Sequence, residues 1–143
     1  MISLQENVTE DFLAACQRLI PQLSSSSAPL SCAAAAALLS QPGVYQLVYR
    51  VAEGAPILGM LTLVTFQIPT GTRAWIEDVV VDDAARGHGA GQQLVEAALA
   101  HAAQLGVKSV DLTSRPSREA ANRLYRRCGF EARDTNVYRY HAQ

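Results

Sequence analysis

The chain has 143 residues, of which 49% are hydrophobic and 17% are charged. This length and balance predict one globular domain over residues 1–143 and exclude an intrinsically disordered chain. The formal net charge is −1 at pH 7, which argues against a general affinity for nucleic acid or for an anionic membrane surface.

Cysteine and histidine are too few and too scattered to predict a metal site. The three residues of each type show neither zinc-ligand nor redox spacing, so free thiols in a reducing compartment are the simplest interpretation. Residues 1–10 lack the segments of a secretion signal, and the longest apolar run, residues 32–39, is too short to cross a bilayer. We therefore expect a soluble, cytoplasmic protein without a metal.

The first forty residues predict a short strand and two helices. Residues 2–4 alternate weakly, as in a strand. Thr9 is placed to cap a helix that starts at Glu10 and that Pro21 is expected to end. After a serine-rich connection, residues 32–39 predict a second short helix.

Three antiparallel strands are predicted next, at residues 44–51, 57–66 and 73–81, separated by turns rich in glycine and proline. Gly59 inside the second strand indicates a bulge or close packing. A polar, glycine-rich turn follows the third strand, and residues 92–105 are good helix formers ended by Gly106.

The C-terminal part predicts a strand at residues 108–112 and a helix that Ser117 caps and Gly129 ends. Two final strands are predicted at residues 130–133 and 137–140. This order of elements indicates an α/β (α+β) fold with a mixed, mostly antiparallel central sheet and helices on both of its faces.

The glycine-rich turn is the first segment with recognisable chemistry. It reads Arg86-Gly87-His88-Gly89-Ala90-Gly91 and lies between a valine-rich strand and a long helix. The first turn of a helix has unpartnered N–H groups and partial positive charge, and glycines let a phosphate approach them. The turn therefore predicts a pyrophosphate site, with a purely structural strand-to-helix connection as the alternative.

The spacing of the glycines separates this turn from two common phosphate loops. A Walker loop needs Lys-Ser/Thr after its last glycine, where Gln92-Gln93 stands. A dinucleotide fingerprint needs glycine three residues after Gly89, where Gln92 stands. The remaining pattern resembles the acetyl-CoA-binding motif of the GCN5-related N-acetyltransferase (GNAT) family, Gln/Arg-x-x-Gly-x-Gly/Ala, with Arg86, Gly89 and Gly91 at the fixed positions.

A second segment strengthens the resemblance. Residues 121–130 are similar to the family's Ala-x-x-Leu-Tyr-x-x-x-Gly-Phe element, matching at Leu124, Tyr125, Gly129 and Phe130. The two segments lie at the distance that the family shows, so their joint match is more specific than either alone. The resemblance covers roughly residues 44–140.

The resemblance implies direct transfer of an acetyl group from acetyl-CoA to a primary amine, without a metal. In the family, backbone groups of the strand before the turn bond the pantetheine amides and the turn contacts the pyrophosphate. Those roles would fall on Val79, Val80 and Val81, and on Arg86, Gly87, His88, Gly89, Ala90, Gly91 and Gln92. The family's tyrosine beside the sulfur corresponds to Tyr125, which could also be an amphipathic core residue.

A carboxylate in the strand before the turn is the candidate base. Glu77 and Asp78 interrupt an otherwise apolar run, and Glu77 could take a proton from the amine directly or through water. The alternative is that Glu77 only pairs with an arginine at a sheet edge. Thr113 and Arg118 stand where many family members have a glutamate and an asparagine, which argues against acetylation of ribosomal proteins.

The sequence leaves the acceptor open, and a small-molecule amine is the expectation. No nucleic-acid or membrane partner is expected, while exposed strand edges would allow a homodimer. Two other functions remain as alternatives: a non-catalytic acyl-CoA-binding sensor or scaffold, and a nucleotide-binding domain of another family.

Overall fold

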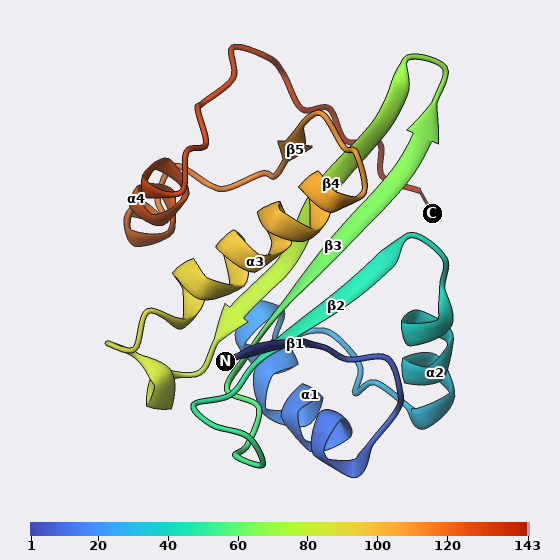
Figure 1. Cartoon of the computed structure of the whole chain (residues 1–143), viewed down its shortest axis with the longest axis vertical. Helices are drawn as coiled ribbons and strands as arrows, with labels where there is room; N and C mark the ends of the chain where they lie inside the picture. The colour runs from blue at the N-terminus through green and yellow to red at the C-terminus, as the bar shows by residue number, and fades with distance from the viewer. Residues whose placement is uncertain (143) are drawn as a thin grey trace.

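The computed structural model describes residues 1–142 and forms one five-stranded sheet with helices on both faces (Figure 1). The strands lie in chain order across the sheet: β1 (Ile2–Leu4), β2 (Val44–Tyr49), β3 (Gly59–Ile68), β4 (Gly71–Val81) and β5 (Val110–Asp111). Neighbours among the first four strands pair antiparallel, whereas β5 pairs parallel to β4. The predicted mixed, mostly antiparallel sheet is confirmed.

The helices are α1 (Glu10–Leu23), α2 (Cys32–Ser40), α3 (Ala90–Gln104) and α4 (Glu119–Arg127), with a 3-10 turn at Asp83–Ala85. Two of them begin where local capping chemistry dictates. The Thr9 hydroxyl accepts a hydrogen bond from the Phe12 N–H at 3.0 Å, and the Ser31 hydroxyl accepts one from the Ala34 N–H at 3.1 Å.

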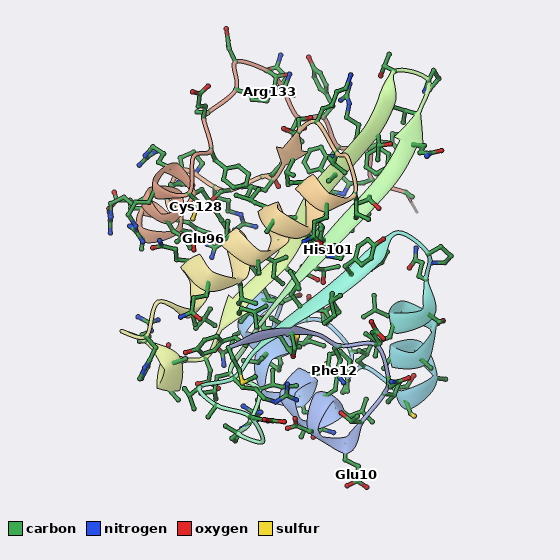
Figure 2. All side chains as sticks on the ribbon, viewed as in Figure 1. Glu10, Phe12, Glu96, His101, Cys128 and Arg133 are labelled. Atoms are coloured by element: carbon green, nitrogen blue, oxygen red, sulfur yellow. The ribbon has the colours of Figure 1, made fainter. Side chains whose placement is uncertain are left out.

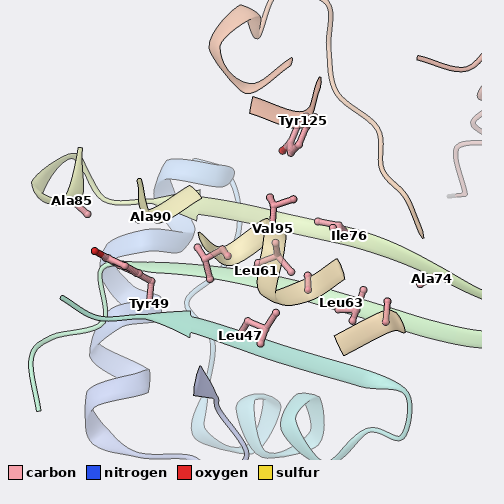
Figure 3. Packing of buried hydrophobic residues seen from close by; sticks show 13 residues of the cluster. Leu47, Tyr49, Leu61, Leu63, Ala74, Ile76, Ala85, Ala90, Val95 and Tyr125 are labelled. Carbon is pink, nitrogen blue, oxygen red and sulfur yellow. The ribbon is translucent and has the colours of Figure 1, made fainter. Parts of the chain in front are cut away.

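The sheet separates two hydrophobic clusters. On one face the strands pack against α3 through Leu61, Leu63, Leu94 and Val95, which are all fully buried (Figure 3). On the other face α1 and α2 cover a second cluster centred on Phe12, Leu19, Val48 and Ile57. The sheet therefore has no free face along its centre, and function must lie at its ends or edges.

Pro21 does not end the first helix, contrary to the expectation from sequence. It lies inside α1, which continues to Leu23. Proline has no N–H, so the helix loses one backbone hydrogen bond at Pro21. The Ser24 N–H still donates a hydrogen bond to the Ile20 carbonyl at 3.0 Å. The last turn therefore closes around the proline.

The strand predicted at 108–112 forms, but it is limited to the two residues of β5. Two other expectations for the C-terminal part are wrong. The helix α4 follows Arg118, with no side-chain cap from Ser117. No strand forms at 130–133 or 137–140 within the described residues. We call residues 130–142 the tail. Its alternating apolar residues favour a strand, but a strand needs a partner, and Tyr138 and Tyr140 are 87% and 92% exposed.

Candidate functional site

The glycine-rich turn connects the end of β4 to the start of α3 and depends on left-handed backbone at two positions. Gly87 has φ +83° and Gly89 has φ +68°, a region that favours glycine. A Cβ atom on Gly87 would meet nothing within 4 Å, and one on Gly89 would only reach the Gln93 side chain at 4.0 Å. Both glycines are therefore required by backbone conformation, and both face open space.

The same turn presents a row of backbone donors without partners. Within residues 1–142, the N–H groups of Gly87, Gly89, Ala90, Gly91 and Gln92 donate no hydrogen bond. They lie at the positive end of a 15-residue helix whose N-cap, Gly89, has no side chain to satisfy them. Free donors together with an open approach fit a diphosphate, so the residues suit the phosphate group that the sequence predicts.

Arg86 precedes this row and is exposed. Its Nε donates a hydrogen bond to the Asp83 carboxylate at 2.8 Å, and both side chains are 80% exposed. An ion pair this exposed contributes little stability. The guanidinium can therefore exchange Asp83 for a phosphate oxygen at low cost.

Gly91 has a different role from the two left-handed glycines. A Cβ atom there would approach the Leu124 side chain to 3.1 Å. The missing side chain lets α4 pack on the first turn of α3, and Cys128 at the end of α4 lies near Glu96 on α3 (Figure 2). Burial and the Glu96 carboxylate both raise the pKa of the Cys128 thiol. Because Gly91 has no side chain, Leu124 of α4 can pack closely here, and this contact helps to position the helix that carries Tyr125.

The edge of β4 that faces β5 is open near the turn. The two strands pair only at Ala74–Val110 and Trp75–Asp111, so they separate before β4 reaches the turn (Figure 1). The opposite edge of β4 is held along its length by β3. Backbone groups of Val79, Val80 and Val81 on the open edge can therefore pair with an extended ligand that has amide groups.

A β-bulge interrupts β4 beside this open edge. Val80 pairs with Met60 and Glu77 with Thr62, so two residues of β4, Asp78 and Val79, oppose one residue of β3. Asp78 has φ +50°, which aspartate tolerates better than most residues. The bulge disrupts the ladder and re-aims the side chains that follow it. The sequence predicts a regular strand here, because a bulge is defined by the register with the neighbouring strand.

A cleft of about 620 Å³ lies where β4 and β5 separate. It is lined by Glu77, Arg86 and Tyr125 together with the three valines of β4. His88 and the glycines of the turn do not line it. Gly87, His88 and Gly89 continue from Arg86 along the exposed surface, whereas Gly91 is half-buried. Residues that sequence reasoning did not place here are Gln22 and Leu23, at the end of α1, and Arg139, on the tail.

Tyr125 lies on α4 and is 7% exposed. Its ring packs edge-on against Phe130, with centroids 5.9 Å apart. Burial raises the pKa of the Tyr125 hydroxyl, the nearby Arg118 cation opposes that rise, and Cys128 adds to it. The hydroxyl therefore stays protonated at neutral pH and can act as a proton donor.

Glu77 is exposed to the cleft beside the bulge. Within residues 1–142 it makes no ion pair, so the purely structural pairing with an arginine is not found. Arg115, Arg118 and Arg139 also line the cleft without an ion pair in the described part of the chain. Free carboxylate and free cations thus face the same space.

Two other kinds of site are not found in residues 1–142. No group of three or more histidine, cysteine, aspartate or glutamate side chains is close enough together to hold a metal ion. None of the described helices is both long and apolar enough to pass through a bilayer.

The model of the acetyltransferase (GNAT) family matches residues 10–130 of this sequence. The chain belongs to this family. No curated protein matches it in sequence. Members of the family use acetyl-CoA as cosubstrate, which agrees with the free donors at the start of α3 and the open edge of β4.

Solved structures confirm the fold. A protein assigned as an acetyltransferase from Agrobacterium tumefaciens str. C58 is 28% identical, with a TM-score of 0.83 over 97% of this chain and 99% of the other. Glucosamine-6-phosphate N-acetyltransferase from Arabidopsis thaliana is 19% identical, with a TM-score of 0.80 over 99% of each chain. An aminoglycoside acetyltransferase from an uncultured soil sample, in complex with sisomicin, is also 19% identical, with a TM-score of 0.80 over 99% of this chain and 96% of the other.

Proposed function

We propose that this GNAT protein transfers the acetyl group of acetyl-CoA directly to a primary amine of a small molecule. One observation carries the proposal: the free N–H groups at the start of α3 continue into the open edge of β4, which leads to Tyr125. This path matches the order of a diphosphate, an amide-containing arm and a thioester.

The cofactor-binding part uses mainly backbone groups. Arg86 and the N–H groups of residues 87–92 would hold the pyrophosphate, and the open edge at Val79, Val80 and Val81 would bond the pantetheine amides. Acetyl-CoA supplies the activated thioester. The bulge at Asp78 places backbone groups outside the β3 ladder, where one can donate to the thioester oxygen.

The reaction needs two proton transfers. The amine nitrogen attacks the thioester carbon, the carbon–sulfur bond breaks, and the sulfur leaves with the bonding pair. Tyr125 donates its proton to that sulfur, because its hydroxyl is protonated at neutral pH and lines the cleft. Glu77 accepts the proton that the amine loses, directly or through water. The products are an amide and free CoA.

The proposal extends to the acceptor, the location and the assembly of the protein. The solved neighbours include enzymes whose names specify an amino sugar phosphate and aminoglycosides, which supports a small-molecule acceptor here. We place the protein in the cytoplasm, without a metal, nucleic-acid or membrane partner. The outer edges of β1 and β5 have no strand partner in the described sheet, and a homodimer could form through either edge.

A thiol-release assay tests this function. Acetyl-CoA is incubated with the protein and a library of primary amines, and acetylated products are identified by mass. We expect protein-dependent CoA release with at least one amine. If acetyl-CoA binds but no amine increases thiol release, the protein is instead a non-catalytic acyl-CoA-binding module.

A further inference from the structure

The acceptor side of the cleft contains an arginine that neither the family motifs nor the sequence pattern identified. Arg139 comes from the tail, fourteen positions after Tyr125 in the sequence, and lines the cleft together with Gln22 and Leu23 of α1. In Figure 1 the tail passes behind β4, on the face of the sheet opposite α3. Arg139 lines the same cleft as Glu77 and Tyr125.

The other free arginines of the cleft come from a different segment of the chain. Arg115 and Arg118 follow β5 and lead into α4, and the Arg118 cation acts on Tyr125. Arg139 reaches the cleft along a separate segment of chain, the tail.

The charge of the cleft selects among amines. Arg86 pairs with Asp83 in this structure, and Arg115, Arg118 and Arg139 line the cleft together with Glu77 and Asp78. A free amine is cationic at neutral pH, so it gains from the carboxylates but is repelled by the arginines. An acceptor with several amines and no anion is disfavoured most.

We propose that the acceptor is a primary amine that also carries an anionic group, and that Arg139 binds this group while Glu77 faces the amine. A guanidinium matches phosphate and carboxylate with two parallel hydrogen bonds, so either group fits. This inference rests on the proposed acetyl transfer and adds the class of its acceptor.

Matched pairs of acceptors test the proposal in the thiol-release assay. Phosphoethanolamine is compared with ethanolamine, glucosamine 6-phosphate with glucosamine, and β-alanine with β-alanine amide. We expect the anionic member of at least one pair to have a kcat/KM about 10- to 100-fold higher, the range of a charge-assisted hydrogen bond. Comparison of the two phosphate-containing pairs with the carboxylate-containing pair shows which of the two anionic groups the site prefers.

Substitution of Arg139 tests whether this residue causes the preference for anionic acceptors. Arg139→Gln should remove the preference by raising KM for the anionic acceptor, with a smaller effect on kcat, and Arg139→Lys should restore part of it. Affinity for acetyl-CoA should not change in either variant. Arg123→Gln, which removes an exposed arginine of α4 outside the cleft, is the matched control and should keep the preference.

Three results would overturn the inference. The first is equal or higher kcat/KM for the uncharged members, or no acetylation of any anionic member, by protein that binds acetyl-CoA. The second is an unchanged preference in Arg139→Gln. The third is a loss of acetyl-CoA affinity in that variant, which would assign Arg139 to a CoA phosphate. Failure of the wild-type protein to bind acetyl-CoA would instead overturn the proposed function itself.

Discussion

The two walls of the cleft are held in place very differently. The β4 wall is paired along its length with β3 and is backed by buried side chains on both faces of the sheet. The opposite wall consists of the segment that follows the two-residue strand β5, of Tyr125 on α4 and of the tail, and the tail has no strand partner within residues 1–142. One wall is fixed by the core, whereas the other depends on a few contacts.

The difference matches the two tasks of an acetyltransferase. A cosubstrate common to the family can be bound by backbone groups of a well-packed strand and helix, where side-chain identity matters little. An acceptor that differs between members is better contacted by side chains on less constrained segments. Substitutions in the glycine-rich turn and at the valines of β4 should therefore affect acetyl-CoA binding. Substitutions on the other wall, and of Glu77 on β4, should affect turnover and acceptor choice.

Tyr125→Phe should have the largest effect on turnover. Loss of the proton donor is expected to lower kcat by about 100-fold or more, while the acetyl-CoA affinity stays nearly unchanged because the β4 wall is intact. Steady-state kinetics and calorimetric titration of the same variant measure the two quantities. A full rate in Tyr125→Phe would remove the hydroxyl from the mechanism.

Gly89→Val should abolish detectable acetyl-CoA binding. A β-branched residue is strained at φ +68°, by about 1–2 kcal/mol, and relief of this strain would turn the free N–H groups away from the phosphates. The added side chain would also cover the turn that a phosphate approaches. Fluorescence or calorimetric titration gives the affinity, and circular dichroism checks the fold. Wild-type affinity in this variant would contradict the loop assignment.

Gly91→Val should act on packing and stability. The new side chain meets Leu124, whose Cδ2 atom lies 3.1 Å from the position that a Cβ atom would take, and overpacking of this kind costs about 1–3 kcal/mol. Urea denaturation measures the loss. In the double variant with Leu124→Ala, the two effects should not add, with a coupling of about 1 kcal/mol. Strict additivity would show that Leu124 is not the neighbour responsible.

The smallest expected effect is on stability at alkaline pH and comes from Cys16, which is buried in the cluster that α1 and α2 cover. Burial raises the pKa of the Cys16 thiol from 9.0 to about 11. The folded state thus disfavours the thiolate, so Cys16 lowers stability as pH rises from 9 to 11 and has no such effect below pH 9. Between about pH 8 and pH 10.5, the urea midpoint should fall less in Cys16→Ala than in the wild type. An equal fall of the urea midpoint in both proteins would show that the loss of stability at alkaline pH does not come from Cys16.

The β4 wall could be predicted from the sequence because its signals are local. The backbone of this wall is determined by nearby residues: glycines at fixed spacing, a valine-rich strand and a run of helix formers. The cap that Thr9 provides for α1 could be predicted for the same reason, because it is also a local feature. Gly59 also follows its prediction: a Cβ there would lie 3.2 Å from Leu94 and 3.3 Å from the Val80 carbonyl. Close packing explains this glycine.

The other wall could not be predicted in the same way because its structure depends on partners distant in sequence. The alternation of apolar and polar residues in the tail predicts strands whether or not a sheet edge is free to pair with them. The position of Arg139 depends on the path of the whole tail, which no local pattern specifies. The bulge at Asp78 was missed for a related reason, since it is defined by the register with β3.

Calorimetric titration of the wild-type protein with acetyl-CoA, alongside CoA, ATP and NAD, tests the central claim most directly. That claim is that the start of α3 and the open edge of β4 together form an acetyl-CoA site. We predict micromolar binding of acetyl-CoA, comparable binding of CoA, and no binding of ATP or NAD. Folded protein that binds no acetyl-CoA would contradict the claim and leave the glycine-rich turn as a structural connection.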